Sequence, residues 1–337
     1  MTGKISREFF EKNIINRIGS LRNEVVVPPE NGVDVGIIKL GSKYLAVTTD
    51  PFYIDPVFGL KKAAWFGFHI LLSDIYTSGI PAMYMSIDLN LPESMSDDDF
   101  NTIWTVVNDE AKKYDVMVVT GHTARYAGVN YPMLGGVTLM GYGDNYITTK
   151  NASEGDIIIM TKTAALEASC ILSYTFPEYI EKNLGNDTLK NLNDLFYKMS
   201  CVKEEKISID FGLDKITSMH DATEGGLINA IYEIGKASGH GVIINKKNIN
   251  IDESILRVTK LFNIDPLRSI SEGTLLITVK RDYTDQLLSK LKFNGIDSYI
   301  IGELKGNDIR FDTGEIINPG DDQLWDALSY GLESGLK

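Results

Sequence analysis

The stretch "SMHDATEGGLINAIYEIGKASGHGVII", Ser218 to Ile244, places a polar cluster and two glycines directly before an apolar run. Leu227, Ile231 and Ile234 recur at helical spacing, which predicts a helix that packs one face against a core. We expect this helix to run from about Glu224 to Ser238. Because a helix start needs only one capping side chain, the glycine pair at its beginning requires a further explanation.

The glycine pair, Gly225 and Gly226, has two interpretations on local sequence. A helix N-terminus presents unpaired N–H groups and the positive end of a dipole, and glycines there allow an anion to approach closely. Thr223 would then cap the helix, with the proton-active side chains of His220 and Asp221 beside it. The alternative is an ordinary tight turn followed by a capped helix.

Length and charge restrict the class of protein. A chain of 337 residues predicts two domains, and we place the boundary in the polar connector "NYITTKNASEGD", giving domains 1–150 and 151–337. The formal charge of -13 repels nucleic-acid phosphates, and it also repels free ATP unless a divalent cation mediates. Most of the carboxylates are expected to form a solvated surface.

The sequence favours a cytoplasmic protein. Its two cysteines, Cys170 and Cys201, form no CxxC pair, so a zinc site is not expected and reduced thiols are. The start, "MTGKISREFFEKNIINRIG", is amphipathic and charged and lacks the apolar core of a signal peptide. No apolar run approaches the length of a membrane span, so a membrane is not an expected partner. The formal charge of -13 makes a nucleic acid an unexpected partner as well.

Strands and helices are mixed in both halves without the regular alternation of a dinucleotide-binding fold, so we predict an α+β fold for each. The expected strands are residues 43–50, 82–92, 116–121, 133–143, 156–162, 273–279 and 298–304. The further expected helices are residues 63–79, 94–115, 163–176 and 281–295.

Three aspartates of the first half have similar settings. Asp34 lies among glycines before a strand, Asp50 ends the strand "LAVTTD", and Asp74 interrupts an apolar helical run. Carboxylates in such places are costly unless they are paired, hydrogen-bonded or bound to metal. Because Mg²⁺ prefers a few carboxylates together with phosphate oxygens, the three predict a Mg-nucleotide site. The alternative is that each makes a local cap or turn bond, as we expect of Asp55 before Pro56.

The segment "VTGHTARYAG", Val119 to Gly128, predicts a strand followed by Gly121, His122 and Thr123. A glycine without a Cβ lets a phosphate approach, and a threonine hydroxyl with a neighbouring proton donor would hold it. The alternative is a plain turn.

Seven segments in this order resemble one known group of enzymes. They are "NGVDVG", "LAVTTDPFYIDPVF", "LLSDIYTSGIPAMYMSIDLNLP", "VVTGHT", "EGDIIIMTKTAALEASCIL", "HDATEGGLINAIYEIGKASG" and "EGTLLITV". Together they cover nearly the whole chain, and they resemble the aminoimidazole ribonucleotide synthetase-related (PurM-like) superfamily. Within it, "TTDPFYIDPVF" and "HDATEGG" are most similar to hydrogenase maturation factor E, a carbamoyl dehydratase.

The resemblance implies two α+β domains and a homodimer in which strands of both N-terminal domains form a shared β-barrel. It implies ATP and Mg²⁺ as cofactors and a small-molecule substrate whose oxygen is activated by phosphorylation, mainly through positioning and charge neutralisation. One alternative is a small-molecule kinase similar to thiamine-monophosphate kinase. Another is a catalytically silent nucleotide-binding partner in a maturation complex.

The resemblance also implies three groups of site residues by position. The candidate metal ligands are Asp34, Asp50 and Asp74. The candidate nucleotide-binding residues are Thr49, expected beside these aspartates, and Gly121, Thr123, Thr223, Gly225 and Gly226. The candidate catalytic residues are His220, Asp221 and His122.

Two departures from the superfamily pattern change what we expect. Many relatives have an aspartate where this chain has His122, and a neutral imidazole is a poor Mg²⁺ ligand. One possibility is that the site binds fewer metal ions, and another is that His122 donates a hydrogen bond to a phosphate. The third is that His122 is only a histidine on a turn. The maturation factor carries its carbamoyl group on a terminal cysteine, whereas no cysteine follows Cys201. We therefore expect a different acceptor, a free small molecule; selenophosphate synthesis is also not expected, because no cysteine lies near the N-terminus.

Overall fold

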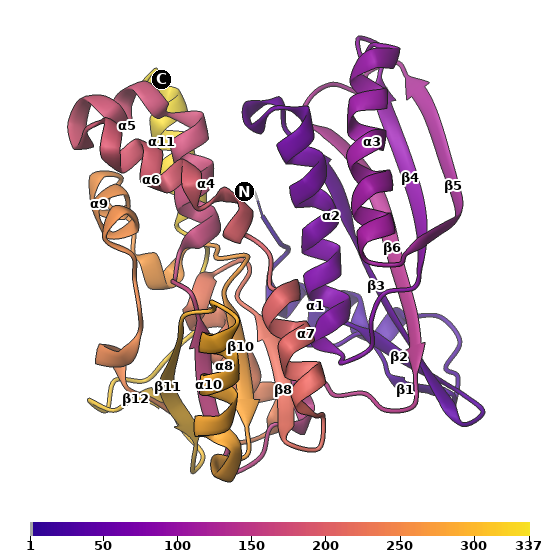
Figure 1. Ribbon diagram of the computed structural model, residues 1–337, viewed down its shortest axis with the longest axis vertical. Helices are drawn as coiled ribbons and strands as arrows, with labels where there is room; N and C mark the ends of the chain where they lie inside the picture. Colours follow the sequence, from indigo (N-terminus) through magenta and orange to yellow (C-terminus); the bar gives the residue numbers. More distant parts are fainter. Residues whose placement is uncertain (1–2) are drawn as a thin grey trace. The chain divides into compact units, whose positions relative to one another are not determined.

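The computed structural model describes residues 3–337, so the first two residues of the expected N-terminal domain lie outside the described residues. The chain falls into two units, each built around one sheet (Figure 1). The N-terminal unit consists of Asn23–Pro28 and Asp34–Tyr146. The C-terminal unit consists of the chain up to Arg22, Pro29–Val33 and Ile147–Lys337.

A six-stranded sheet with the order β1-β2-β3-β6-β4-β5 forms the base of the N-terminal unit. Its strands are β1 (Val25–Val27), β2 (Gly36–Leu40), β3 (Lys43–Ile54), β4 (Tyr84–Pro92), β5 (Met117–Tyr126) and β6 (Met133–Gly143). The helices of this unit are α2 (Leu60–Thr77) and α3 (Asp97–Lys113). The pair β4 and β5 is parallel, whereas β3 and β4 each pair antiparallel with β6.

Strand β3 is longer than its apolar pattern predicts. The expected strand ends at Asp50, but β3 continues through Pro51 to Ile54 because β6 pairs with it along its whole length. The pairing of β3 with β2 ends at Val47, and a proline is tolerated where a strand has lost one neighbour. The extension buries Phe52 and Ile54 under α2.

Helices α2 and α3 pack on each other beside one face of this sheet. Helix α3 starts with acidic residues, as predicted. In its capping box the Ser96 side chain accepts from the main-chain N–H of Asp99, and the Asp99 side chain accepts from the main-chain N–H of Ser96. Helix α2 is largely buried. Nε2 of His69 on α2 lies 3.1 Å from Oε2 of Glu110 on α3. This buried pair therefore ties the two helices together.

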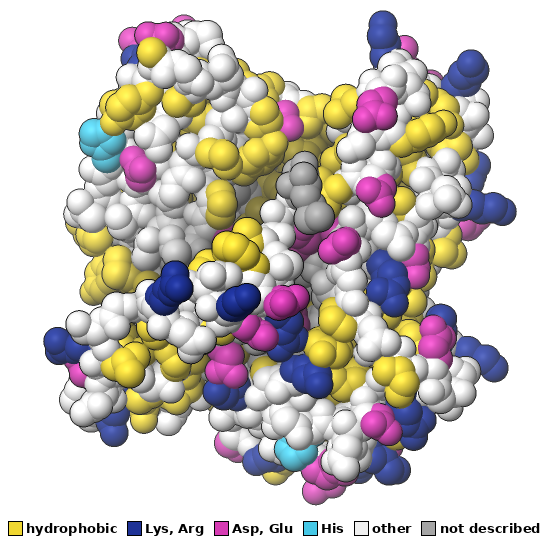
Figure 2. Space-filling view, turned by 180° about the vertical axis from the view of Figure 1, so that it is seen from behind, with side chains coloured by type: hydrophobic (Ala, Val, Ile, Leu, Met, Phe, Trp, Pro, Cys, Tyr) yellow, Lys and Arg dark blue, Asp and Glu magenta, His cyan; other side chains and the backbone are white. Residues whose placement is uncertain are grey.

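The other face of the sheet, which we call the open sheet face, exposes large hydrophobic side chains. Cross-strand partners point to the same side of a sheet, and Tyr53 pairs with Leu134 while Tyr84 pairs with Met117. The exposed hydrophobic residues of these strands include Tyr53, Tyr84, Met117, Leu134 and Tyr142. Elsewhere, acidic and basic side chains are interspersed among hydrophobic ones, as on the surface drawn in Figure 2.

A second six-stranded sheet, with the order β12-β9-β11-β7-β10-β8, forms the base of the C-terminal unit. Its strands are β7 (Ile157–Thr161), β8 (Ile216–Asp221), β9 (Val242–Ile244), β10 (Leu275–Val279), β11 (Ser298–Leu304) and β12 (Ile309–Phe311). Its helices are α1 (Arg7–Asn13), α4 (Leu166–Thr175), α5 (Pro177–Leu184), α6 (Asn186–Asp194), α7 (Val202–Phe211), α8 (Gly226–Ser238), α9 (Glu253–Leu261), α10 (Thr284–Phe293) and α11 (Leu324–Glu333).

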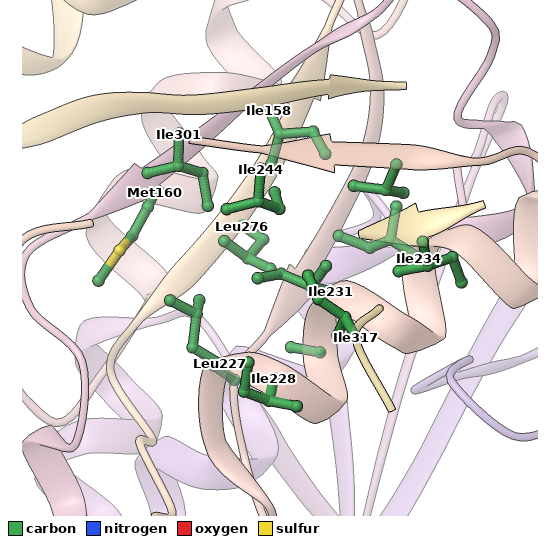
Figure 3. Close-up of a cluster of buried hydrophobic side chains, with 14 of the residues drawn as sticks. Ile158, Met160, Leu227, Ile228, Ile231, Ile234, Ile244, Leu276, Ile301 and Ile317 are labelled. Carbon is green, nitrogen blue, oxygen red and sulfur yellow. The ribbon is translucent and has the colours of Figure 1, made fainter. Parts of the chain in front are cut away.

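Two hydrophobic clusters cover the two faces of this sheet. Helix α8 lays Leu227, Ile231 and Ile234 against strand residues such as Ile158 and Leu276, as Figure 3 shows. The predicted apolar face of this helix is therefore confirmed. The cluster on the other face includes side chains of α7 and α10 and alternate residues of the same strands.

Gly239 ends α8 in the left-handed conformation, with φ of 76°. Within residues 3–337, no helix combines the length and the apolar character that a membrane crossing requires.

Candidate functional site

In the N-terminal unit, two of the three predicted metal ligands meet at the hydroxyl of Thr48. Thr48 Oγ1 lies 3.0 Å from the carbonyl oxygen of Asp34 and 3.2 Å from Oδ2 of Asp74. Thr48 is buried, and both aspartates are half-buried. The fold therefore brings together β3, the segment before β2 and the last turn of α2.

Asp50 lies on the same face of β3 as Thr48, because it follows two residues later and side chains of a strand alternate between faces. The donors on this face of β3 are carboxylate, carbonyl and hydroxyl oxygens. Such hard oxygen donors suit Mg²⁺, which takes few protein ligands and keeps sites for water and phosphate. The oxygen atoms on this face are thus of the chemical type that binds magnesium.

Thr49 does not lie beside the aspartates, and that part of the prediction is wrong. Its hydroxyl is on the open sheet face, where it donates to the carbonyl of Val137 at 3.0 Å and accepts from Thr138 Oγ1 at 3.1 Å. Thr48 takes the expected place, because a shift of one residue along a strand reverses the face. A nucleotide contact by Thr49 stays a prediction.

The Gly121-His122-Thr123 segment lies within β5 and not after it, so the strand is longer than predicted and the alternative of a plain turn is wrong. A Cβ at Gly121 would lie 2.5 Å from the carbonyl oxygen of Ile87 on β4, so the close pairing of these strands requires glycine. His122 is exposed, and its Nε2 lies 2.8 Å from the hydroxyl of Tyr126. The phosphate contacts predicted for Gly121 and Thr123 remain predictions.

In the C-terminal unit, the glycine pair forms the turn between β8 and α8. Gly225 and Gly226 have φ of +79° and +64°, a region that favours glycine. A Cβ on Gly226 would lie 2.5 Å from the carbonyl oxygen of Ser269. Gly226 is therefore required by the packing of the helix start on the backbone of Ser269, which answers the question that the sequence raised.

A carboxylate of the chain itself already binds at this helix start. Gly225 N donates to Oδ2 of Asp322 at 2.6 Å, and Oδ1 of Asp322 accepts from Leu324 N at 2.8 Å. Burial raises the pKa of Asp322 to about 6. The predicted cap by the Thr223 side chain is wrong, since Thr223 accepts from Gly226 N through its carbonyl oxygen. Asp322 was missed because it follows Gly225 by 97 residues.

Glu224 holds the start of the chain against the same turn. Its two carboxylate oxygens lie 3.0 and 2.9 Å from Lys4 N, and Trp325 Nε1 donates to Oε1 at 3.0 Å. The Lys4 ammonium lies 3.4 Å from Oγ1 of Thr223. The turn that carries the candidate residues is thus fixed from α11 and from the N-terminal segment.

His220 and Asp221, the last two residues of β8, are both buried. Nε2 of His220 lies 2.9 Å from Oε2 of Glu233 on α8. Sequence reasoning missed Glu233, because it is one polar residue on a mostly apolar helix and has no motif around it. The structure therefore places the two catalytic candidates directly before the glycine turn.

A second buried carboxyl near this turn makes stability depend on pH. Burial raises the pKa of Glu167 from 4.5 to about 8, and its Oε2 accepts from Glu272 N at 3.2 Å. Between these two pKa values the folded chain holds a proton that the unfolded chain has lost. The free energy of unfolding should therefore fall as pH rises from about 5 to about 8, by up to roughly 1.4 kcal/mol per unit.

Urea denaturation of the wild type and of Glu167→Gln over this pH range tests the assignment. The variant has no carboxyl to ionise, so its stability should fall less steeply with pH than that of the wild type. Parallel pH profiles for the two proteins would show that Glu167 is not the group responsible.

The fold and these residues define a two-domain α+β protein, with two aspartates that contact the Thr48 hydroxyl in one unit and a glycine turn at a helix start in the other. Two family models match it: the N-terminal domain of AIR synthase related proteins over residues 32–142 and their C-terminal domain over residues 153–312. The chain belongs to this AIR synthase-related, PurM-like family. The resemblance inferred from the seven segments is therefore confirmed.

Proteins of named activity are similar to this chain over most of its length. A thiamine-monophosphate kinase of Pyrococcus abyssi is 25% identical over 90% of this chain and 92% of its own. The carbamoyl dehydratase HypE of Escherichia coli is 23% identical over 77% of this chain and 76% of its own. A crystal structure of the hydrogenase maturation protein HypE in complex with ATP has a TM-score of 0.66, with 18% identity over 95% of this chain and 96% of that one.

Proposed function

We propose that this protein is an ATP- and Mg²⁺-dependent enzyme that activates an oxygen of a small substrate by phosphorylation. The meeting of Asp34 and Asp74 at Thr48, with Asp50 on the same face of β3, is the observation that carries the proposal. The family membership supports it, as does the related HypE structure that was solved with ATP.

In this proposal, the N-terminal unit, which carries the three aspartates, binds the nucleotide. Asp34, Asp50 and Asp74 hold the metal, and the Thr48 hydroxyl orients Asp74. Magnesium, when bound, supplies positive charge that neutralises the phosphate oxygens and lets an anionic chain bind ATP. Gly121 and Thr123 contact the nucleotide, and His122 donates a hydrogen bond to a phosphate.

Domain 151–337 handles the substrate in this proposal. Thr223, Gly225 and Gly226 shape the turn against which the substrate binds. His220 and Asp221 take up the proton of the substrate oxygen as its bond to phosphorus forms and the bond between the γ-phosphorus and the leaving oxygen of ADP breaks.

A small-molecule kinase is the second candidate, because the Pyrococcus abyssi relative is a thiamine-monophosphate kinase. In that case the phosphorylated species is released as the product and is not attacked further. A silent nucleotide-binding partner in a maturation complex is the third. Release of ADP separates the enzymes from the silent partner, and recovery of a stable phosphorylated product separates the kinase from the activating enzyme.

We also propose a homodimer in which the open sheet faces of two chains meet and form a shared barrel. The exposed Tyr53, Tyr84, Met117, Leu134 and Tyr142 support this arrangement, since a row of hydrophobic residues on a sheet face is typical of an interface. Light scattering should give twice the chain mass for the wild type and the chain mass for Met117→Asp.

The test of the proposed activity is ADP formation from ATP by the purified chain. We expect ATP binding only with Mg²⁺, and ADP release that rises when a cell extract is fractionated and a fraction contains the substrate. Removal of the metal with EDTA should abolish both. Equal ATP binding with and without Mg²⁺ would contradict the proposed metal site, and binding without turnover in any fraction would favour the silent partner.

A further inference from the structure

His220 contacts a carboxylate of the neighbouring helix from a nearly buried position. Its side chain is 4% exposed, and its Nε2 lies 2.9 Å from Oε2 of Glu233, whose side chain is 32% exposed. In the sheet, His220 pairs with Leu276, which belongs to the cluster under α8. The imidazole therefore stands on the face of the sheet that α8 covers.

Glu233 is in turn confined by the segment around Gly32. Gly32 has φ of +74°, and a Cβ there would lie 2.7 Å from Cβ of Glu233. The adjacent Asn31 donates to Oε1 of Glu11 at 3.0 Å, and Arg7 forms an ion pair with the same oxygen at 2.8 Å. The Gly32 turn is thus anchored to α1, and any larger residue there would displace Glu233. This accounts for the glycine of the "NGVD" segment.

The chain contains a second histidine–glutamate pair that offers a matched control. His69 and Glu110 are 3.1 Å apart, with side chains 2% and 16% exposed. They join α2 to α3 in the N-terminal unit, and Lys113 also contacts Glu110, at 3.0 Å. Since neither residue is a candidate site residue, this pair shows what a histidine–carboxylate contact does when it only holds helices together.

We propose that Glu233 is a positioning residue for His220, and that Gly32 keeps it in place. The Glu233 carboxylate accepts a hydrogen bond from Nε2–H of His220 and so fixes both the ring orientation and the tautomer. In the neutral ring the proton is then on Nε2 and the lone pair is on Nδ1. The catalytic part of this inference rests on the proposed function, whereas the positioning part does not.

Two variants separate the parts of the interaction. Glu233→Gln keeps an oxygen that accepts from Nε2–H but removes the charge, and Glu233→Ala removes the acceptor. Glu110→Ala makes the same change in the control pair. Urea denaturation of all three establishes how much stability each has lost, so that a loss of function can be judged in folded protein only.

The first readout is the tautomer of His220, measured by proton–nitrogen correlation NMR on protein labelled with ¹⁵N-histidine. The chain has four histidines, so the spectrum has four imidazoles, and a His220→Gln variant identifies the one of interest. We expect the Nε2–H form in the wild type and in Glu233→Gln. In Glu233→Ala we expect a mixture of both tautomers, while Glu110→Ala leaves the His220 signals unchanged.

The second readout is ADP formation with Mg-ATP and the most active extract fraction. Loss of a residue that orients a functional imidazole typically lowers activity by about 10–100-fold. We therefore expect kcat of Glu233→Ala to fall by that factor, with KM for ATP unchanged. Glu233→Gln should recover most of the loss. Glu110→Ala should retain the wild-type kcat.

Each outcome decides a part of the inference. A pure Nε2–H form of His220 in Glu233→Ala overturns the positioning role. A changed tautomer with unchanged kcat overturns the catalytic use of that position. If the wild-type chain forms no ADP, the proposed function fails, and the NMR spectrum alone then decides whether Glu233 positions His220.

Discussion

Gly226→Ala should lose more than about 4 kcal/mol of stability, an exceptional value for one methyl group. The new Cβ would lie 2.5 Å from the carbonyl oxygen and 2.9 Å from the nitrogen of Ser269. Both are backbone atoms, which cannot rotate away as the end of a side chain can. Because the free energy of unfolding of a native domain is only about 5–15 kcal/mol, much of the variant should be unfolded at moderate denaturant concentration.

Gly239→Ala is the matched control for this prediction. Gly239 ends the same helix with a similar φ, +76°, but nothing lies within 4 Å of its added Cβ. It should lose only the cost of a left-handed residue, about 1–2 kcal/mol. Equal losses for the two variants in urea denaturation would show that the contact with Ser269 does not constrain the helix start.

Asp50→Asn should weaken Mg-ATP binding by at least about a hundredfold. Even the loss of a residue that only hydrogen-bonds to a metal ligand lowers metal affinity by about 10–100-fold. The change removes one negative oxygen donor and keeps the shape of the side chain. Asp50 is half-buried at the point where β3 passes beyond β2, so we expect the free energy of unfolding to change little. Calorimetric titration of ATP in the presence of Mg²⁺ measures the effect.

Asp109→Asn serves as the control, because Asp109 is exposed on α3 and its carboxylate accepts a hydrogen bond from the neighbouring Asn108 side chain at 2.9 Å. Its affinity for Mg-ATP should equal that of the wild type. If Asp50→Asn binds Mg-ATP as tightly as Asp109→Asn, Asp50 is not a metal ligand.

Many of the longer helices and strands could be predicted from hydrophobic periodicity, but helices α5, α6, α7, α9 and α11 were not predicted. The strand Met133–Gly143 and the apolar face of Gly226–Ser238 are as expected, because each pattern agrees with its tertiary environment. The strands that contain Asp50-Pro51 and Gly121-His122-Thr123 extend further than predicted. Their residues are typical of turns, but pairing with β6 and β4 outweighs this local preference.

The candidate site could be predicted only in part. Asp34, Asp50 and Asp74 stand out because a carboxylate beside apolar residues needs a partner. Choosing Thr48 instead of Thr49 requires the orientation of the strand relative to α2, which the sequence does not contain. Asp322 and Glu233 act through contacts that only the fold brings about.

Crystals grown with Mn²⁺ and a non-hydrolysable ATP analogue test the central claim most directly. Manganese replaces magnesium at oxygen sites and gives an anomalous signal that locates each ion. We predict an ion within about 2.0–2.5 Å of oxygen atoms of Asp34, Asp50 and Asp74 and next to the phosphates. An ion and nucleotide bound away from all three aspartates would contradict it.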